Sequence, residues 1–363
     1  MNQSQLDLLR LHLSPGIGRS VLFKLRHHFG CFSVAAAASG SAWQQAGVAA
    51  QLRHTLLDPA AEEFVTCRTK MADLAVRLIS FWDADYPALL RTIYDPPALL
   101  YLRGRLPQAD GFAVVGSRQA TASGLSFARD VAKGLAQRNI CVISGMARGV
   151  DSAAHCGALA AGGTTVAVLG CGVDRIYPPE STRLYREILA QGALLSEHPP
   201  GTPPAAGHFP GRNRIISGLA RGVLIVEAAR GSGSLITAEF ALEQGRELFA
   251  MPGEVRHPNS HGPHQLLKEG AQLVTEVSDI LHALWPDQVA CRQRSTPQQD
   301  LAAILSGNAL AVYRQLQETP VHQDEIARKC ALTPMELSAI LLDLELRGGV
   351  RQLPGGHYVR GLL

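Results

Sequence analysis

The sequence predicts an α/β protein built on an extended Rossmann-like sheet, doubly wound and mostly parallel, with a small helical domain before it and a winged helix after it. Between Ser80 and about Trp285, apolar runs of strand length alternate with helical segments. Near-continuous Val, Ile, Leu and Ala in such runs is typical of parallel strands covered on both faces. Several runs end in glycine-rich turns, and the residues after 300 show three helical segments followed by a hairpin pattern.

The length and composition indicate a globular chain of three domains. The 363 residues are 46% hydrophobic and 18% charged, which is too long for one ordinary core and too apolar for a disordered chain. We expect domains at residues 1–75, 80–285 and 301–363, with a polar linker at 286–300. Because the net charge is only +3, any surface that binds nucleic acid must be local.

The cysteines and the hydropathy pattern indicate the cellular compartment of the protein. The seven cysteines are scattered and include no Cys-x-x-Cys pair, which predicts reduced thiols. No apolar run reaches the roughly 18–20 residues that span a bilayer, and the first residues lack a basic-then-apolar signal. The sequence therefore predicts a cytoplasmic protein that has no contact with a membrane.

The first 75 residues predict short packed helices. Leucines from Leu6 to Leu13 mark a first helix, which ends at Pro15-Gly-Ile-Gly18, and Leu22, Leu25 and Phe29 mark a second one. The glycine turn and the basic residues after it are similar to a SAM or helix-hairpin-helix module, whose turn can touch DNA phosphates. A tight turn between two packed helices needs the same glycines, so the pattern also suits a purely structural role.

The central region contains the strands of the predicted sheet. They are residues 112–115, 140–143, 165–169, 193–196, 223–226 and 248–251. Glycine-rich turns follow four of them, at Gly116-Ser117-Arg118, Ser144 to Asp151, Gly170-Cys-Gly172 and Gly231 to Thr237. Because ligands bind beyond the carboxyl ends of parallel strands, these turns predict one extended site at one edge of the sheet.

The turns do not match the common nucleotide motifs. None is a G-x-G-x-x-G with an acidic residue about 20 positions later, and none is a Walker loop, so neither a nicotinamide cofactor nor ATP hydrolysis is supported. Asp151 and His155 lie one helical turn apart, which is typical of an ordinary helical pair. His257, His261 and His264 have no neighbouring carboxylate or thiol to complete a metal site. We therefore expect no cofactor, no metal and no catalytic residue.

The stretch from His208 to Ala238 is the strongest candidate for binding an anion. Phe209, Arg212 and Arg214 lie just before one predicted helix, and the glycine-serine loop at 231–234 opens another. A helix N-terminus leaves backbone N–H groups unpaired and carries a partial positive charge, so it attracts phosphate. Arginines add charge-assisted hydrogen bonds to such a site.

The same residues also allow a purely structural interpretation. Ser232, Ser234 and Thr237 are of the types that cap helices, and the two arginines could pair with Glu227 or Glu239. Two such loops, together with the Arg118 turn upstream, favour the anion site.

The C-terminal residues predict a winged helix with an unusual third helix. The three helices are expected at about 308–318, 323–329 and 334–346, and the wing at 350–359. The third helix carries Glu336, Asp343 and Glu345 against one cation, Arg347. Because carboxylates are repelled by phosphates, we predict that this helix does not enter a DNA groove and that the module contacts protein.

The motifs together closely resemble one family, DNA-processing protein A, also called DprA or Smf. They cover most of residues 80–285 in order: Val115–Arg118, Ser144–Asp151, Ala167–Asp174 with Tyr177-Pro178, Phe209–Ser217, Ser232–Ala238, Pro252-Gly253 and Lys268–Ala271. One departure is His264, which stands where the family's Gly-x-Asn pattern has asparagine.

The resemblance implies a cytoplasmic protein without catalytic chemistry that binds single-stranded DNA and forms a homodimer through the Rossmann-like domain. It also implies a partner, the recombinase RecA, which such a protein loads onto DNA taken up in natural transformation. The DNA or phosphate site that it implies consists of Ser117, Arg118, Gly145, Met146, Arg148, Phe209, Arg212, Asn213, Arg214, Gly231, Ser232, Gly233, Ser234 and Thr237. Arginines would hold the backbone while Phe209 stacks on a base of any sequence.

An enzyme is the alternative function. The loop from Gly231 to Glu239 is similar to that of phosphoribohydrolases of the lysine-decarboxylase-like type, which bind a nucleotide at the same sheet edge. Their pattern places a glutamate three residues after a threonine, whereas Glu239 lies two residues after Thr237. This shift turns the carboxylate to another side of the helix and favours the DNA-binding function.

Overall fold

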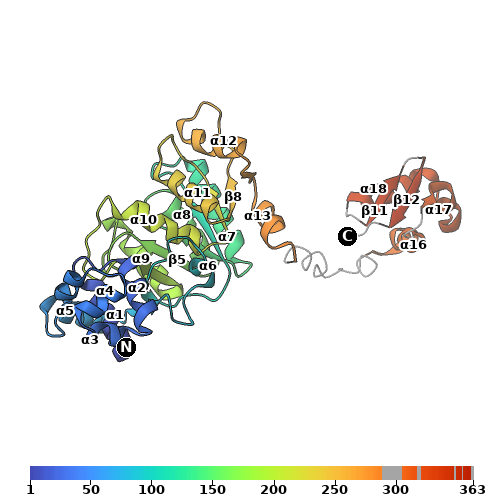
Figure 1. The fold of residues 1–363 in the computed structure, drawn as a ribbon. Helices are drawn as coiled ribbons and strands as arrows, with labels where there is room; N and C mark the ends of the chain where they lie inside the picture. Colours follow the sequence, from blue (N-terminus) through green and yellow to red (C-terminus); the bar gives the residue numbers. More distant parts are fainter. Residues whose placement is uncertain (288–304, 317–319, 347–348, 354, 361–363) are drawn as a thin grey trace. The chain divides into compact units, whose positions relative to one another are not determined.

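The structure is a computed structural model that describes residues 1–287, 305–316, 320–346, 349–353 and 355–360 (Figure 1). The chain forms two compact units, residues 1–289 and residues 290–363. Most of the predicted linker at 286–300 lies outside the described residues, as do Arg347 and the end of the first predicted winged-helix helix. Within the described residues, no helix has the length and the apolar character needed to cross a membrane.

A nine-stranded sheet of order β1-β2-β6-β5-β4-β3-β7-β8-β9 forms the centre of the first unit. From β6 to β9 all neighbouring strands pair in parallel, whereas β1 and β2 add an antiparallel edge. The strands are β1 (Arg77–Ser80), β2 (Leu99–Gly104), β3 (Gly111–Val115), β4 (Cys141–Ser144), β5 (Thr165–Leu169), β6 (Ala193–Ser196), β7 (Gly222–Ile225), β8 (Glu247–Ala250) and β9 (Gln272–Leu273). This arrangement confirms the predicted doubly wound, mostly parallel fold.

Helices cover both faces of this sheet, as the apolar strands require. One face packs against α7 (Ala122–Ala136), α8 (Val150–Ala160), α9 (Thr182–Gln191) and α13 (Val277–Leu284). The other face packs against α6 (Ala88–Arg91), α10 (His208–Gly218), α11 (Gly233–Glu243) and α12 (His261–Lys268). Strands β3, β4, β5 and β7 lie side by side, so the glycine-rich turns that follow them meet at one edge.

The N-terminal helices share a core with the antiparallel edge of the sheet. They are α1 (Gln3–Leu13), α2 (Arg19–Phe29), α3 (Phe32–Ala37), α4 (Gly40–Gln45) and α5 (Glu62–Asp73). Their leucines and Trp43 pack with Leu99 and Tyr101 of β2 in one cluster of buried side chains. The boundary expected near residue 75 therefore lies inside one compact unit.

The second unit has the helices and the wing of the predicted winged helix. The helices are α16 (Gly307–Gln315), α17 (Gln323–Cys330) and α18 (Pro334–Leu346). Strands β10 (Val321–His322), β11 (Val350–Leu353) and β12 (His357–Arg360) form a small sheet of order β10-β12-β11. Leu337, Leu341 and Leu344 of α18 point into its core.

Candidate nucleic-acid interface

The ring of Phe209 lies at the centre of a pocket on the carboxyl edge of the sheet. Its neighbours are the guanidinium carbons of Arg118 and Arg212, 5.6 and 5.8 Å from the ring centre, and the ring of Tyr177, whose centre is 5.6 Å away. Gly170, at the end of β5, makes room for the ring, because a side chain at this position would press against it. We call this site the aromatic pocket and define it by Arg118, Gly170, Tyr177, Phe209 and Arg212.

The two cations of the aromatic pocket, Arg118 and Arg212, differ in their hydrogen bonds to the rest of the protein. Arg118 is exposed and makes no hydrogen bond or ion pair within the described residues, so its donors are free for a ligand. Arg212 is only 6% exposed, and its guanidinium donates to the carbonyl oxygens of Gly145 and Val168 and to the side chain of Asn213. The pocket therefore combines a free surface cation with a fixed cation beneath the ring.

Asp151 lies beneath Arg212 and balances its charge. The Asp151 carboxylate accepts hydrogen bonds from the backbone N–H of Gly145 (3.1 Å) and of Ala147 (3.4 Å). Burial raises the pKa of Asp151 above its usual value, while the Arg212 charge and these hydrogen bonds oppose the shift. Burial likewise lowers the pKa of the Arg212 guanidinium, and Asp151 opposes that shift. Gly145 is needed here because a Cβ would collide with the Arg212 guanidinium.

Two other residues of the 144–151 turn, Met146 and Arg148, differ in whether their side chains reach the pocket. Met146 is fully buried in the core between α8, α9 and the sheet, so its side chain is not available to a ligand. Arg148 is exposed and lines the pocket, where it forms an ion pair with Glu180. The carboxylate of Glu180 competes with phosphate for this arginine, so Arg148 is less available than Arg118.

The loop that opens α11 is tied to α10. Ser232 is the N-cap of α11, and its hydroxyl accepts a hydrogen bond from the Ser234 N–H (3.4 Å). Asn213 donates to the Gly233 carbonyl oxygen (3.0 Å), and Thr237 is buried. Gly231, whose φ is +71°, and Gly233 are exposed, so the backbone of this loop is open to a ligand while the side chains of Asn213 and Thr237 support it from below.

Glu227 connects three loops of this edge. Its carboxylate accepts hydrogen bonds from the N–H and the hydroxyl of Thr121 (3.0 and 2.5 Å) and from the side chain of Asn259 (3.1 Å). It therefore holds the start of α7, just after Ser117 and Arg118, and does not pair with either arginine of α10. The hydroxyl of Ser117 accepts a hydrogen bond from the Gln119 N–H (3.1 Å), which shapes the Arg118 turn.

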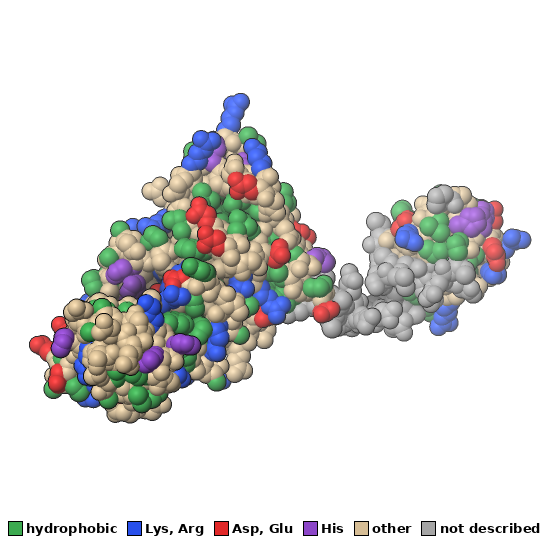
Figure 2. All heavy atoms as spheres, in the orientation of Figure 1, with side chains coloured by type: hydrophobic (Ala, Val, Ile, Leu, Met, Phe, Trp, Pro, Cys, Tyr) green, Lys and Arg blue, Asp and Glu red, His purple; other side chains and the backbone are tan. Residues whose placement is uncertain are grey.

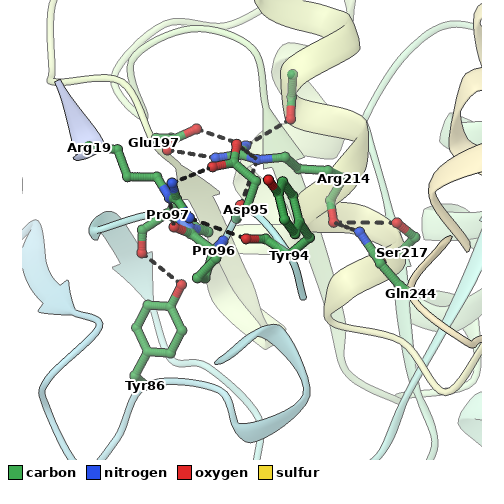
Figure 3. Close-up of polar contacts among 11 residues, drawn as sticks. Arg19, Tyr86, Tyr94, Asp95, Pro96, Pro97, Glu197, Arg214, Ser217 and Gln244 are labelled. Atoms are coloured by element: carbon green, nitrogen blue, oxygen red, sulfur yellow. Dashed lines mark hydrogen bonds and ion pairs between the residues drawn. The ribbon is translucent and has the colours of Figure 1, made fainter. Parts of the chain in front are cut away.

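Arg214 lies outside the aromatic pocket, although the motif places it beside Arg212. It donates to both carboxylate oxygens of Glu197 (2.8 and 2.9 Å) and to Asp95, whose carboxylate lies 3.1 Å away (Figure 3). Asp95 also forms an ion pair with Arg19 of α2 at 2.8 Å. Burial alone would lower the pKa of Arg214, but Glu197 and Asp95 raise it. The guanidinium is thus occupied by protein partners, which argues against the expected role of Arg214 as a phosphate donor.

Tyr177 is a pocket residue that was not among the site residues expected from the motifs. Its ring is 38% exposed and packs at 36° to the Phe209 ring. The Tyr177-Pro178 pair is visible in the sequence, but nothing in its spacing indicates that it faces Phe209, which is 32 residues later in the chain and on another element.

Two family models match this chain. The model described as DNA recombination-mediator protein A covers residues 77–285, more than half of the chain and all of the aromatic pocket. The model of the DprA winged helix domain covers residues 296–356.

Two known proteins have sequences similar to that of this chain. Protein Smf from Escherichia coli strain K12 is 45% identical over 284 residues, which cover 76% of this chain and 75% of that protein. DNA processing protein DprA from Streptococcus pneumoniae is 46% identical over 204 residues, 56% of this chain and 72% of that protein.

Solved structures show the same fold. The X-ray structure of DNA processing protein A from Streptococcus pneumoniae superposes with a TM-score of 0.68 at 35% identity, covering 78% of this chain and 98% of that one. The protein from Helicobacter pylori, whose structure describes a single-stranded DNA binding mode, has a TM-score of 0.53 at 29% identity and covers 58% of this chain and 96% of that one. The models, the identities and the fold together show that the chain belongs to the DNA recombination-mediator protein A family.

Proposed function

We propose that this protein binds single-stranded DNA at the aromatic pocket and loads the recombinase RecA onto the strand during natural transformation. The proposal includes a homodimer formed through the α/β unit, no chemical step, and a cytoplasmic location, where RecA and the incoming strand meet. The Helicobacter pylori relative, described for its single-stranded DNA binding mode, supports the choice of ligand.

The observation that carries the proposal is that the ring of Phe209 lies beside the guanidinium of Arg118, which has no ion pair in the described residues. A partly exposed ring stacks on a base whatever the sequence, and a free guanidinium holds the adjacent phosphate. Arg212 adds a positive charge under the ring, and its guanidinium is buried and held in place by hydrogen bonds. The pocket therefore suits an unpaired strand better than a duplex, whose bases are not free to stack on it.

The enzyme alternative has less support. Thr237 is buried and Glu239 is exposed, so the two side chains lie on different sides of α11 and cannot act together in one active site. Incubation of the protein with AMP is expected to release no adenine, and release would favour the phosphoribohydrolase.

The binding function is tested with variants that separate charge from stacking. In fluorescence anisotropy titrations with a labelled oligothymidylate, Arg118→Ala is expected to weaken binding and to reduce the salt slope by about 0.7, the value for one phosphate of a single strand. Phe209→Ala is expected to cost about 1–3 kcal/mol of binding free energy and to leave the salt slope unchanged, because stacking releases no counterions.

Arg105→Ala is the matched control. Arg105 is also exposed, but it follows β2 beside the amino end of β6, at the opposite edge of the sheet. Its removal is expected to change neither affinity nor salt slope. Wild-type behaviour of both Arg118→Ala and Phe209→Ala would show that the strand binds elsewhere.

A further inference from the structure

We propose that single-stranded DNA continues from the aromatic pocket into a second, cationic groove, which binds the phosphates of the following nucleotides. This groove, the apical groove, is lined by Arg230, Gly231, His261, His264 and Lys268 and lies between α12 and the loop before α11. The inference rests on the proposed function, since it extends the same strand along the same edge of the sheet.

The charge of the apical groove points to a polyanion. Among the described residues, those that line it include two permanent cations, Arg230 and Lys268, and no carboxylate. Both cations are exposed, and neither has an ion pair or hydrogen bond within the described part of the chain. Figure 2 shows Lys and Arg side chains gathered at this end of the first unit, where α12 lies in Figure 1. Unpaired cations release counterions when they meet phosphate, whereas paired ones must first lose their partner.

The histidines of this region hold the groove in shape. His264 Nε2 lies 3.1 Å from the Gly253 carbonyl oxygen, which ties α12 to the turn after β8. His257 Nδ1 accepts a hydrogen bond from the Asn259 N–H at 3.2 Å. His264 thus bridges two elements and His257 shapes its own turn, and no group of three or more metal-ligating side chains occurs in the described residues. This arrangement supports a role for His264 as a fixed wall of the groove, which His261 also lines.

Two hydrogen bonds connect the elements that carry the aromatic pocket and the apical groove. Asn259, two residues before His261, donates to the Gln119 carbonyl oxygen at 2.9 Å, next to Arg118. Asn213, next to Arg212, donates to the Gly233 carbonyl oxygen at 3.0 Å, in the loop that carries Arg230 and Gly231. The elements that bear the two sites are therefore joined at two points, so one strand can pass from one site to the other over a fixed floor.

The experiment compares two ligand lengths. Oligothymidylates of about four and about sixteen nucleotides, the range of site sizes known for single-strand grooves, are titrated at several salt concentrations. The proteins are wild type, Arg230→Ala, Lys268→Ala, the double variant and the Arg105→Ala control. We expect the longer ligand to lose about 0.7 of salt slope for each cation removed from the groove. The shorter ligand fills only the aromatic pocket, so its affinity is expected to stay at the wild-type value.

The outcomes separate this inference from the proposed function. If wild type binds and Arg118→Ala reduces binding, but the double variant keeps the wild-type slope on the longer ligand, the apical groove does not hold the strand. Equal losses on both ligands would also overturn the inference, since the cations would then act on the aromatic pocket. If wild type binds neither ligand, the proposed function itself has failed. A melting temperature like that of wild type checks that the double variant is folded.

Discussion

Arg212 and Arg214 are two residues apart in α10 and belong to the same motif, yet their guanidinium groups have different surroundings. Arg212 turns toward Phe209 and the carbonyl oxygens of the sheet edge. Arg214 turns away, toward Glu197 and Asp95. Residues at i and i+2 of a helix point about 200° apart, so one of them faces the pocket and the other faces the loops beside β2 and β6.

Arg214→Ala is therefore expected to act on stability and not on phosphate contacts. Removing the side chain leaves Glu197 and Asp95 without their shared cation, which we expect to cost about 2 kcal/mol of unfolding free energy. This is less than for a fully buried pair, because the two carboxylate side chains are 27% and 47% exposed. Urea denaturation measures the loss, and anisotropy at several salt concentrations is expected to give the wild-type slope.

Arg118→Ala is the opposite case in the same two assays. Arg118 makes no ion pair in the described residues. The unfolding free energy of the variant is therefore expected to stay within about 0.5 kcal/mol of wild type, while the salt slope of its DNA binding falls. A variant at Arg214 with wild-type stability and a reduced slope would return this arginine to the DNA site.

Helix α18 differs from a helix that reads DNA. Leu337, Leu341 and Leu344 face the core, while Glu336 and Glu345 are exposed. Met335 and Leu342 are also exposed, at 85% and 59%, so the outer face mixes carboxylates with apolar side chains. Such a face repels phosphate and suits a protein partner.

We therefore expect residues 290–363 alone to give no band shift with single-stranded or duplex DNA. The carboxylates of α18 are the reason, so reversing the charge with Glu336→Lys and Glu345→Lys is expected to create weak, salt-sensitive binding. A shift by the unaltered unit would show that another of its surfaces, such as the wing, contacts DNA.

The parallel strands were predictable because each is a continuous apolar run between turn signals, and β5 and β6 begin and end at the predicted residues. The antiparallel edge was not predicted. Strand β2, Leu99–Gly104, alternates between two cores, with Leu100 facing the helices beside α10 and Tyr101 facing the N-terminal helices. Its pattern depends on the N-terminal helical layer, which ends with α5 at Asp73 and therefore lies outside any short window of sequence around β2.

The candidate site was predictable where a residue type carries its own chemistry. Phe209, Arg118 and the open backbone at Gly231 lie where the motifs suggested. Burial and remote partners were not predictable: Met146 faces the core, and Arg214 meets Asp95, which is 119 residues away in the chain. Charge and spacing along one helix cannot reveal a partner that is brought there by tertiary structure.

In the proposed function, RecA loading depends on DNA binding and on the proposed homodimer together. With strands coated by single-strand-binding protein, wild type is expected to shorten the lag before RecA hydrolyses ATP. Arg118→Ala is expected to leave the lag unchanged, because it removes the free cation of the aromatic pocket. Light scattering after gel filtration is expected to show wild type and variant as dimers of equal mass.

Arg105→Ala, with the same loss of charge at the opposite edge, is expected to shorten the lag as wild type does. A lag shortened equally by Arg118→Ala would separate loading from the aromatic pocket and make the protein contact with RecA sufficient.

The carboxylate of Glu227 has a consequence for the speed of binding. By holding Thr121 and Asn259 at once, it fixes the turns beside Arg118 and beside the apical groove to the end of β7. A strand that arrives at this edge meets donors that are already in place, so little ordering entropy is lost on contact. If the proposed function holds, we expect the association rate to be set by electrostatically guided collision and not by the closing of a loop.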